Sequence, residues 1–236
     1  MHLNALTRLA GVAVALWVAS NVAATTPRAA SQAPASTLSL PSRGDTIGAF
    51  VPPHWSVENQ LRGDLNGDHQ PDSALVLVEA ESLVPSGDTA RKRAIVLLLN
   101  AEGGWRRVGF STSVLQCPTC GGALYGGATA PAHVSLVGGS VIVRQDHGSR
   151  NVVEQTFRFR YESATDRFWL IGLDTSDRDR ATGRLVKEST NFLTGQKVAT
   201  ESQFDGRTQQ FVVRSSTRQR VDRARIALEE VNYEAF

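Results

Sequence analysis

Short apolar runs, each closed by charged residues or by glycine, aspartate or asparagine, recur along most of this chain. Residues 73–79 (SALVLVE) and 94–99 (AIVLLL) have strand length and are rich in Val, Ile and Leu, which favours buried strands over helices. Residues 154–161 alternate, with Phe157 and Phe159 on one side and arginines on the other. The sequence therefore predicts a mainly β fold with little helix.

The predicted strands follow one another closely, so we expect an antiparallel meander in a sandwich-like or partial propeller-like single domain. The remaining strands are predicted at residues 105–110, 133–137, 140–144, 152–161, 167–173, 185–190, 196–204 and 209–214. Glycines at 138–139 are a two-residue hairpin signal, and a polar loop is expected at 85–88 (PSGD). Residues 217–230 are expected to form a short C-terminal helix or to stay extended.

The N-terminus has the organisation of a secretory signal peptide. His2 and Arg8 give a weakly basic start, and residues 9–18 (LAGVAVALWV) form an apolar run. A membrane-spanning helix needs roughly 20 apolar residues, so this run has the length of a signal-peptide core. We expect a signal peptide at residues 1–24, cleaved near Ala24, and an uncleaved anchor is the alternative. The mature chain is then periplasmic or secreted, without a membrane span.

A spacer is predicted between the signal peptide and the folded part. Residues 25–43 are rich in Ala, Ser, Thr and Pro and carry almost no charge. Such a composition buries too little apolar surface to offset the entropy of ordering, so we expect a disordered linker. Residues 44–236 then form one β-rich domain that is long enough to build its own core.

The charge balance argues against nucleic acid as a partner. The chain holds 25 Lys and Arg against 23 Asp and Glu, a net charge of +2. The basic clusters at residues 91–93 and 214–225 contain no aromatic residues, whereas nucleic-acid surfaces combine the two. The expected partner is a protein or a glycan, whose identity the sequence does not specify.

One motif carries a defined chemistry, the aspartate-rich segment 64–72 (DLNGDHQPD). Oxygen-bearing side chains stand at its first, third, fifth and ninth positions, and the seventh offers a backbone carbonyl. Calcium takes about six to eight oxygen ligands, and this spacing brings oxygens together in one loop. The candidate metal ligands are Asp64, Asn66, Asp68, Gln70 and Asp72. A polar turn closed by side-chain hydrogen bonds, without metal, is the alternative.

The run GDLNGDxxxD, leading straight into an apolar strand, resembles the calcium loop of FG-GAP or VCBS repeats. These repeats occur in integrin-like propeller blades and in secreted bacterial proteins, and the resemblance implies a structural calcium ion held by the five residues above. Two positions depart from the pattern. His69 replaces the usual glycine, and Leu75 stands where an EF-hand has an acidic residue. Because the motif occurs once, a full propeller is not expected.

A second resemblance covers most of the mature chain. A tryptophan before the aspartate motif (Trp55), a CxxCGG segment, a Trp-Leu-Ile-Gly strand and the sequence NFLTG at 191–195 occur in this order. The same order is found in a group of exported bacterial proteins, and this resemblance implies no known activity.

Cys117 and Cys120 are the only cysteines and are separated by two residues. In an oxidising compartment the simplest expectation is a structural disulfide. The CxxC spacing also occurs in redox centres, where the motif opens a helix, but glycines 121–122 make a poor helix start here. Structural zinc would need a second pair of ligands, which is absent from the sequence.

The sequence contains no convincing catalytic motif. It has no Gly-x-Ser-x-Gly elbow and no phosphate loop. Residues 145–149 (QDHGS) hold the three residue types of a catalytic triad, but neighbouring side chains diverge, so we interpret them as a turn. The expected function is an exported binding or structural module, and no catalytic residue is predicted. The alternatives are an extracytoplasmic hydrolase with a site built from distant residues, or a CxxC redox protein.

Overall fold

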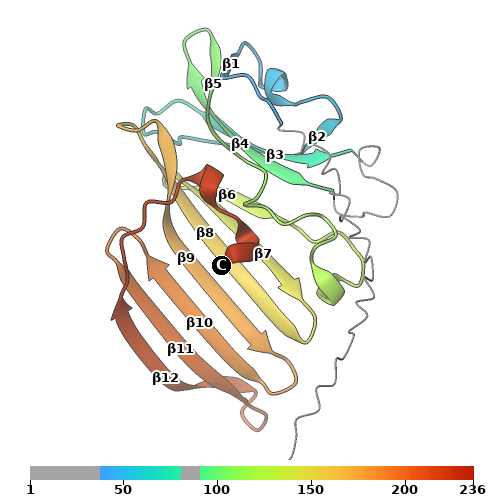
Figure 1. Cartoon of the computed structure of the whole chain (residues 1–236), viewed down its shortest axis with the longest axis vertical. Helices are drawn as coiled ribbons and strands as arrows, with labels where there is room; N and C mark the ends of the chain where they lie inside the picture. The colour runs from blue at the N-terminus through green and yellow to red at the C-terminus, as the bar shows by residue number, and fades with distance from the viewer. Residues whose placement is uncertain (1–37, 81–90) are drawn as a thin grey trace, which may run out of the picture. The chain divides into compact units, whose positions relative to one another are not determined.

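The computed structural model describes residues 38–80 and 91–236, which form two antiparallel sheets (Figure 1). The five-stranded sheet, in the order β1-β5-β4-β3-β2, contains β1 (Arg43–Gly44), β2 (Trp55–Gly63), β3 (Asp72–Glu79), β4 (Arg93–Ala101) and β5 (Gly104–Ser111). The seven-stranded sheet is a continuous meander from β6 to β12. The mainly β class and the antiparallel meander are therefore confirmed.

The strands of the seven-stranded sheet are long. They are β6 (His133–Val137), β7 (Ser140–Gly148), β8 (Asn151–Glu162), β9 (Arg167–Asp179), β10 (Arg184–Asn191), β11 (Gln196–Asp205) and β12 (Gln210–Arg220). The helical segments among the described residues are short 3-10 turns: η1 (Ile47–Phe50), η3 (Gly122–Tyr125), η4 (Leu228–Glu230) and η5 (Tyr233–Ala235).

One sequence prediction is wrong in this region. Residues 145–148 are not a turn but the last part of β7, paired residue by residue with β8. The strand continues there through polar residues, which the ladder holds by backbone hydrogen bonds and which leave no apolar signal. For residues 217–230 the sequence left a short helix and an extended chain open. Residues 217–220 complete β12, Ala227 forms an isolated bridge with Trp169, and the 3-10 turn η4 follows, so most of the segment is extended.

Several predictions concern residues outside the described ranges. The signal peptide at 1–24, the linker up to residue 37 and the polar loop at 85–88 all lie there. Residues 38–43 are described, and Arg107 binds them by donating from its backbone N–H to the Ser42 carbonyl at 2.9 Å. No helix among the described residues is long and apolar enough to cross a membrane.

Three consecutive hairpins of the meander share one loop design. Each begins with a side chain that accepts hydrogen bonds from backbone N–H groups two or three residues later, supplied by Asp179, Asn191 and Asp205. In two of the loops the closing residue, Gly183 or Gly195, has a positive φ of 74° or 65°, a conformation that glycine adopts without strain. These loops fix the register of β9 to β12 locally.

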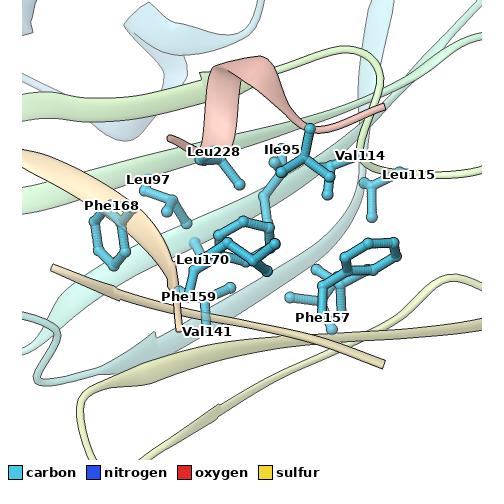
Figure 2. Packing of buried hydrophobic residues seen from close by; sticks show 14 of the residues in the cluster. Ile95, Leu97, Val114, Leu115, Val141, Phe157, Phe159, Phe168, Leu170 and Leu228 are labelled. Carbon is cyan, nitrogen blue, oxygen red and sulfur yellow. The ribbon is translucent and has the colours of Figure 1, made fainter. Parts of the chain in front are cut away.

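The main core lies between the two sheets (Figure 2). Phe157 and Phe159 of β8 are fully buried there, with ring centroids 6.4 Å apart, and face Ile95 and Leu97 of β4. Leu228 of η4 joins the same cluster, so the C-terminal segment completes the core. Burying apolar surface in this way is the main favourable term in folding.

A second, smaller core covers the other side of the five-stranded sheet. Phe50 of η1 packs there against Leu75 and Leu77 of β3 and Val96 and Leu98 of β4. The strands β3 and β4 are thus buried on both faces, which explains why their sequences are unbroken apolar runs rather than alternating ones.

The seven-stranded sheet extends beyond the five-stranded one. The main core draws on β6 to β9, whereas β10, β11 and β12 continue past it (Figure 1). Every residue of the edge strand β12 is exposed. This part of the sheet therefore offers open surface.

A buried arginine connects the parts of the structure around the cores. The side chain of Arg93, the first residue of β4, has no exposed surface. Its guanidinium forms a bidentate ion pair with Glu58 at 2.5 and 2.6 Å, at a bulge of β2. It also donates to the carbonyls of Gln116 and Ala130 at 3.1 and 2.9 Å. The arginine thus binds both ends of the loop that precedes β6.

Replacing Arg93 with methionine is expected to lower the free energy of unfolding by about 3 kcal/mol, because one carboxylate and two buried carbonyls lose their donor. Urea denaturation followed by tryptophan fluorescence measures the change. Arg144→Met is the matched control, since its ion pair with Glu154 is largely exposed and its loss should cost less than about 1 kcal/mol. Equal losses in the two variants would contradict the role given to Arg93.

Candidate functional site

The aspartate loop between β2 and β3 is closed by its own side chains. Both carboxylate oxygens of Asp64 accept backbone N–H groups, from Gly67 at 2.6 Å and from His69 at 3.0 Å. Asn66 accepts from the backbone of Asp68 at 3.0 Å, and its amide donates to the Asp68 carboxylate at 2.8 Å. Five residues of the motif are therefore brought together in one tight turn.

Asp72 differs from the rest of the loop because it is fully buried at the start of β3. One of its oxygens accepts from the backbone of Leu65 at 2.8 Å, and the other from the backbone of Asn100 at 2.9 Å. Burial raises the pKa of this carboxyl, and the two backbone hydrogen bonds oppose that effect. Asp72 thus joins the loop to the end of β4.

His69 adopts the left-handed conformation that its position in the motif requires, with a φ of 66°. A residue with a Cβ atom pays roughly 1–2 kcal/mol for this conformation. The His69 ring lies 3.7 Å from the Asp64 carboxylate and is almost fully exposed. Desolvation raises the pKa of Asp64, but the backbone bonds from Gly67 and His69 outweigh it and lower the pKa overall.

The side-chain oxygens of Asp64, Asn66, Asp68 and Asp72 all accept hydrogen bonds already. Among the described residues no group of three or more His, Cys, Asp or Glu side chains is placed to hold a metal ion. A calcium ion in the loop would need oxygen ligands from Asp64, Asn66 and Asp68 and from the Gln70 carbonyl. To bind there, it would have to displace the hydrogen bond between the Asn66 amide and the Asp68 carboxylate. Calcium binding by the loop stays a prediction.

The cysteines form the expected disulfide between Cys117 and Cys120. The bond lies in the long loop between β5 and β6, immediately before η3. Gly122 has a φ of 68°, and a Cβ atom on it would lie 2.7 Å from the carbonyl oxygen of Gly148. The two glycines after the CxxC motif therefore let the loop approach the end of β7, and the only helical segment they begin is the single 3-10 turn η3.

The residues that resemble a catalytic triad do not form one. Because β7 is a strand, Asp146 and His147 point to opposite faces of the sheet. Asp146 accepts a hydrogen bond from the Tyr125 hydroxyl, whereas His147 packs edge-on against the Tyr233 ring at 6.4 Å. The local sequence thus contains the residue types of a catalytic triad, but the side chains do not lie close enough to one another to act as one.

The seven-stranded sheet has an open face, which we define as the face opposite the main core. A groove of about 680 Å³ crosses it from β8 to β11. Glu154 and Asp174 in this groove are paired with Arg144 and Arg158 at 2.8 and 2.7 Å. Arg178 and Lys187, which are also exposed in the groove, make no ion pair with any described residue. Asp146 and Glu188 also line the groove, and Glu188 is paired with Lys197 at 2.8 Å. The groove therefore carries both signs of charge, with Arg178 and Lys187 as exposed cations.

An exposed apolar cluster adjoins the groove at the sheet edge. Phe204 of β11 and Phe211 and Val213 of β12 are 39%, 38% and 59% exposed on the open face. The two phenylalanine rings are 5.4 Å apart. We call these three residues the edge cluster. Exposed apolar side chains that gather in one place mark interaction surfaces more often than scattered ones do.

Sequence reasoning missed both the groove and the edge cluster. The strands 185–190, 196–204 and 209–214 were predicted, but the sequence does not reveal which face another layer covers. The one available signal is the alternation of β11 and β12 itself. It places Phe204, Phe211 and Val213 on one face, and a search for cross-strand apolar pairs could have found them.

Calcium is expected to raise the melting temperature of the chelator-treated protein, because an ion bound only by the folded state stabilises it. Asp64→Ala and Asp68→Ala should abolish the increase. Asp205→Ala is the matched control, since it removes a carboxylate with similar backbone bonds from the β11–β12 turn and should keep the calcium response. Differential scanning fluorimetry measures all four proteins, and identical curves with calcium and with chelator would exclude the metal.

Tyr125 is expected to stay neutral well above pH 10. Its hydrogen bond to Asp146, and secondly its burial, raise its pKa from 10.0 to about 12. Because the pKa is higher in the folded state, the stabilisation is complete below pH 10 and is lost as the pH rises through about 12. Ultraviolet titration should show one tyrosine ionising at lower pH in Asp146→Asn, and Tyr125→Phe identifies that signal. An unchanged titration would show that Asp146 does not affect the phenol.

Three comparisons, with protein families, with curated proteins and with solved structures, find no match to this chain. What the protein does is therefore inferred from the residues and surfaces described above.

Proposed function

We propose that the protein is an exported binding module that holds a partner protein on the open face of its seven-stranded sheet. The observation that carries this proposal is the edge cluster. Three large apolar side chains lie exposed together at the β11–β12 edge of a face that no other sheet of the described residues covers. Burying such a cluster against a partner removes apolar surface from water, which favours association.

The groove beside the edge cluster supports a partner with acidic side chains. Arg178 and Lys187 are exposed and without ion pairs among the described residues, so they attract negative charge. Threonine and serine hydroxyls between them, such as Thr200 and Ser176, can complete hydrogen bonds to a polar backbone. The groove and the edge cluster together combine polar and apolar contacts, as protein–protein interfaces do.

A protein fits this surface better than a glycan does. Sugar rings are commonly held against tryptophan or tyrosine, whose polar tip adds a hydrogen bond. No tyrosine or tryptophan is among the described residues that line the groove, and Tyr125, which contacts Asp146 in the lining, already donates its hydroxyl to that residue. The edge cluster consists of phenylalanine and valine, which offer apolar area alone.

The aspartate loop has a supporting role in this proposal. It connects β2 and β3 of the five-stranded sheet, whereas the edge cluster lies on β11 and β12 of the seven-stranded sheet. A calcium ion in the loop would stabilise the fold rather than contact the partner. Export places the loop where calcium is abundant, so a site without its usual glycine can still be filled.

Site-specific photo-cross-linking in the producing cell tests the proposal. A photoreactive residue at Ser216, beside the edge cluster, should give a defined adduct with another protein, whereas one at Glu102, in the turn between β4 and β5, should not. Equal adducts from both positions, or none from Ser216, would contradict the proposal.

Substitution of the edge cluster should weaken the same complex. Phe211→Ser with Val213→Ser is expected to reduce the affinity for the cross-linked partner about ten-fold or more, measured by calorimetry with the purified proteins. Leu193→Ser is the matched control, since Leu193 is 54% exposed in a different hairpin. A partner whose affinity falls equally in both variants binds elsewhere.

A further inference from the structure

The loop that carries the disulfide is held in place by bonds that do not involve the sulfur atoms. On one side, Gln116 donates from its backbone to the Gln145 side chain at 2.9 Å and from its amide to the Asp146 carbonyl at 3.0 Å. On the other side, Gly148 donates to the Gly121 carbonyl at 3.1 Å. Both flanks of the CxxC motif are thereby fixed to the end of β7.

The arginine described above adds to this support. Arg93 binds the carbonyls of Gln116 and Ala130, which lie on either side of the disulfide in the chain. Ala130 in turn donates to the carbonyl of Pro118, inside the CxxC motif, at 2.7 Å. The conformation of residues 116–130 is therefore set by backbone and side-chain hydrogen bonds.

The disulfide itself connects no distant parts of the chain. Cys117 and Cys120 are separated by three positions, so the closed ring is very short. A disulfide stabilises a fold mainly by restricting the unfolded chain, and this effect is smallest for short rings. A bond that adds little to a loop already held by other contacts is poorly explained as a structural staple.

The two sulfur atoms differ in access. Cys117 is 8% exposed and packs into the loop, with its sulfur 3.5 Å from the Thr119 hydroxyl. Cys120 is partly exposed and lines an open cavity of about 370 Å³ together with His147 and Tyr233. An incoming thiol can therefore reach Cys120 more readily than Cys117.

We propose that the Cys117–Cys120 bond is a redox site that accepts electrons from dithiols of other exported proteins. A substrate thiolate attacks the sulfur of Cys120, which forms a mixed disulfide and breaks the original bond. The electron pair passes to Cys117, whose thiolate takes up a proton from water and accepts a hydrogen bond from Thr119. The partly exposed cysteine is thus the attacked atom and the buried one the leaving group.

The second half of the exchange completes the transfer of two electrons. The other thiolate of the substrate attacks the substrate sulfur of the mixed disulfide. A disulfide forms in the substrate, and Cys120 leaves as a thiolate and is protonated. The substrate dithiol is oxidised and the CxxC pair is reduced, so sulfur, protons and electrons balance. This activity is independent of the partner surface proposed above, because Cys120 lies at the β7 end of the loop and not at the edge cluster.

Reduction of the wild-type protein is the first test. Because other contacts hold the loop, dithiothreitol should reduce the disulfide while the melting temperature falls by no more than about 3 °C. A disulfide that resists reduction in the folded protein, or a fall of about 10 °C or more on reduction, would identify a structural staple and overturn the proposal.

Single-cysteine variants test the predicted direction of attack. In Cys117→Ser, Cys120 should form a mixed disulfide with oxidised glutathione about ten-fold faster than Cys117 does in Cys120→Ser, as measured by mass spectrometry. Melting curves of both variants verify that they are folded. Equal rates, or faster reaction at Cys117, would overturn the assignment of Cys120.

Oxidation of a model substrate tests the activity itself. The oxidised protein, mixed with a reduced synthetic peptide that holds two cysteines, should convert an equal amount of peptide to its disulfide while its own pair becomes reduced. The Cys117→Ser, Cys120→Ser double variant is the matched control and should leave the peptide reduced. A peptide that stays reduced with the wild-type protein would end the proposal.

Discussion

The buried guanidinium of Arg93 is the interaction on which the surrounding structure depends. It lies at the start of β4 and binds a carboxylate on β2 and two carbonyls of the loop that carries the disulfide. A buried charge is tolerated only when its hydrogen-bonding groups are paired, so these three segments constrain one another. The bulge of β2 at Glu58 and the path of the loop can be understood as consequences of that requirement.

The two sheets contribute unequally to the hydrophobic cores. The five-stranded sheet is covered on both faces and supplies apolar side chains to two cores. The seven-stranded sheet shares the main core through β6 to β9, and no other sheet of the described residues covers β10 to β12. The outer strands therefore depend on hairpin turns and ladder hydrogen bonds for their order. Their surface remains available for contacts with another molecule, which is the basis of the function that we propose.

The sequence allowed most strands to be predicted, because burial imposes a visible pattern. The runs in β3 and β4 and the alternation in β8 are direct results of packing on two faces or one. β2 was missed, since its residues are mostly exposed and polar. The aspartate motif was recognised, yet the burial of Asp72 against Asn100 depends on a strand distant in sequence. Arg93 and Glu58 meet only through tertiary structure, so no local pattern predicts their contact. The residues of the edge cluster pair within one hairpin, but their exposure depends on which face the other sheet covers.

The repeated hairpin loops at Asp179, Asn191 and Asp205 have a consequence for how this architecture can change. Each loop fixes its own turn with one side chain, but Phe192 in the loop at Asn191 also packs against the main core. Among the described core residues none comes from β11, β12 or the loop at Asp205, so this outermost pair is a self-contained unit, and the free side of β12 sets no upper limit on the number of such units. Duplication or loss of a hairpin at this edge would alter the width of the sheet without disturbing either core, so the binding surface can evolve separately from the stability of the fold.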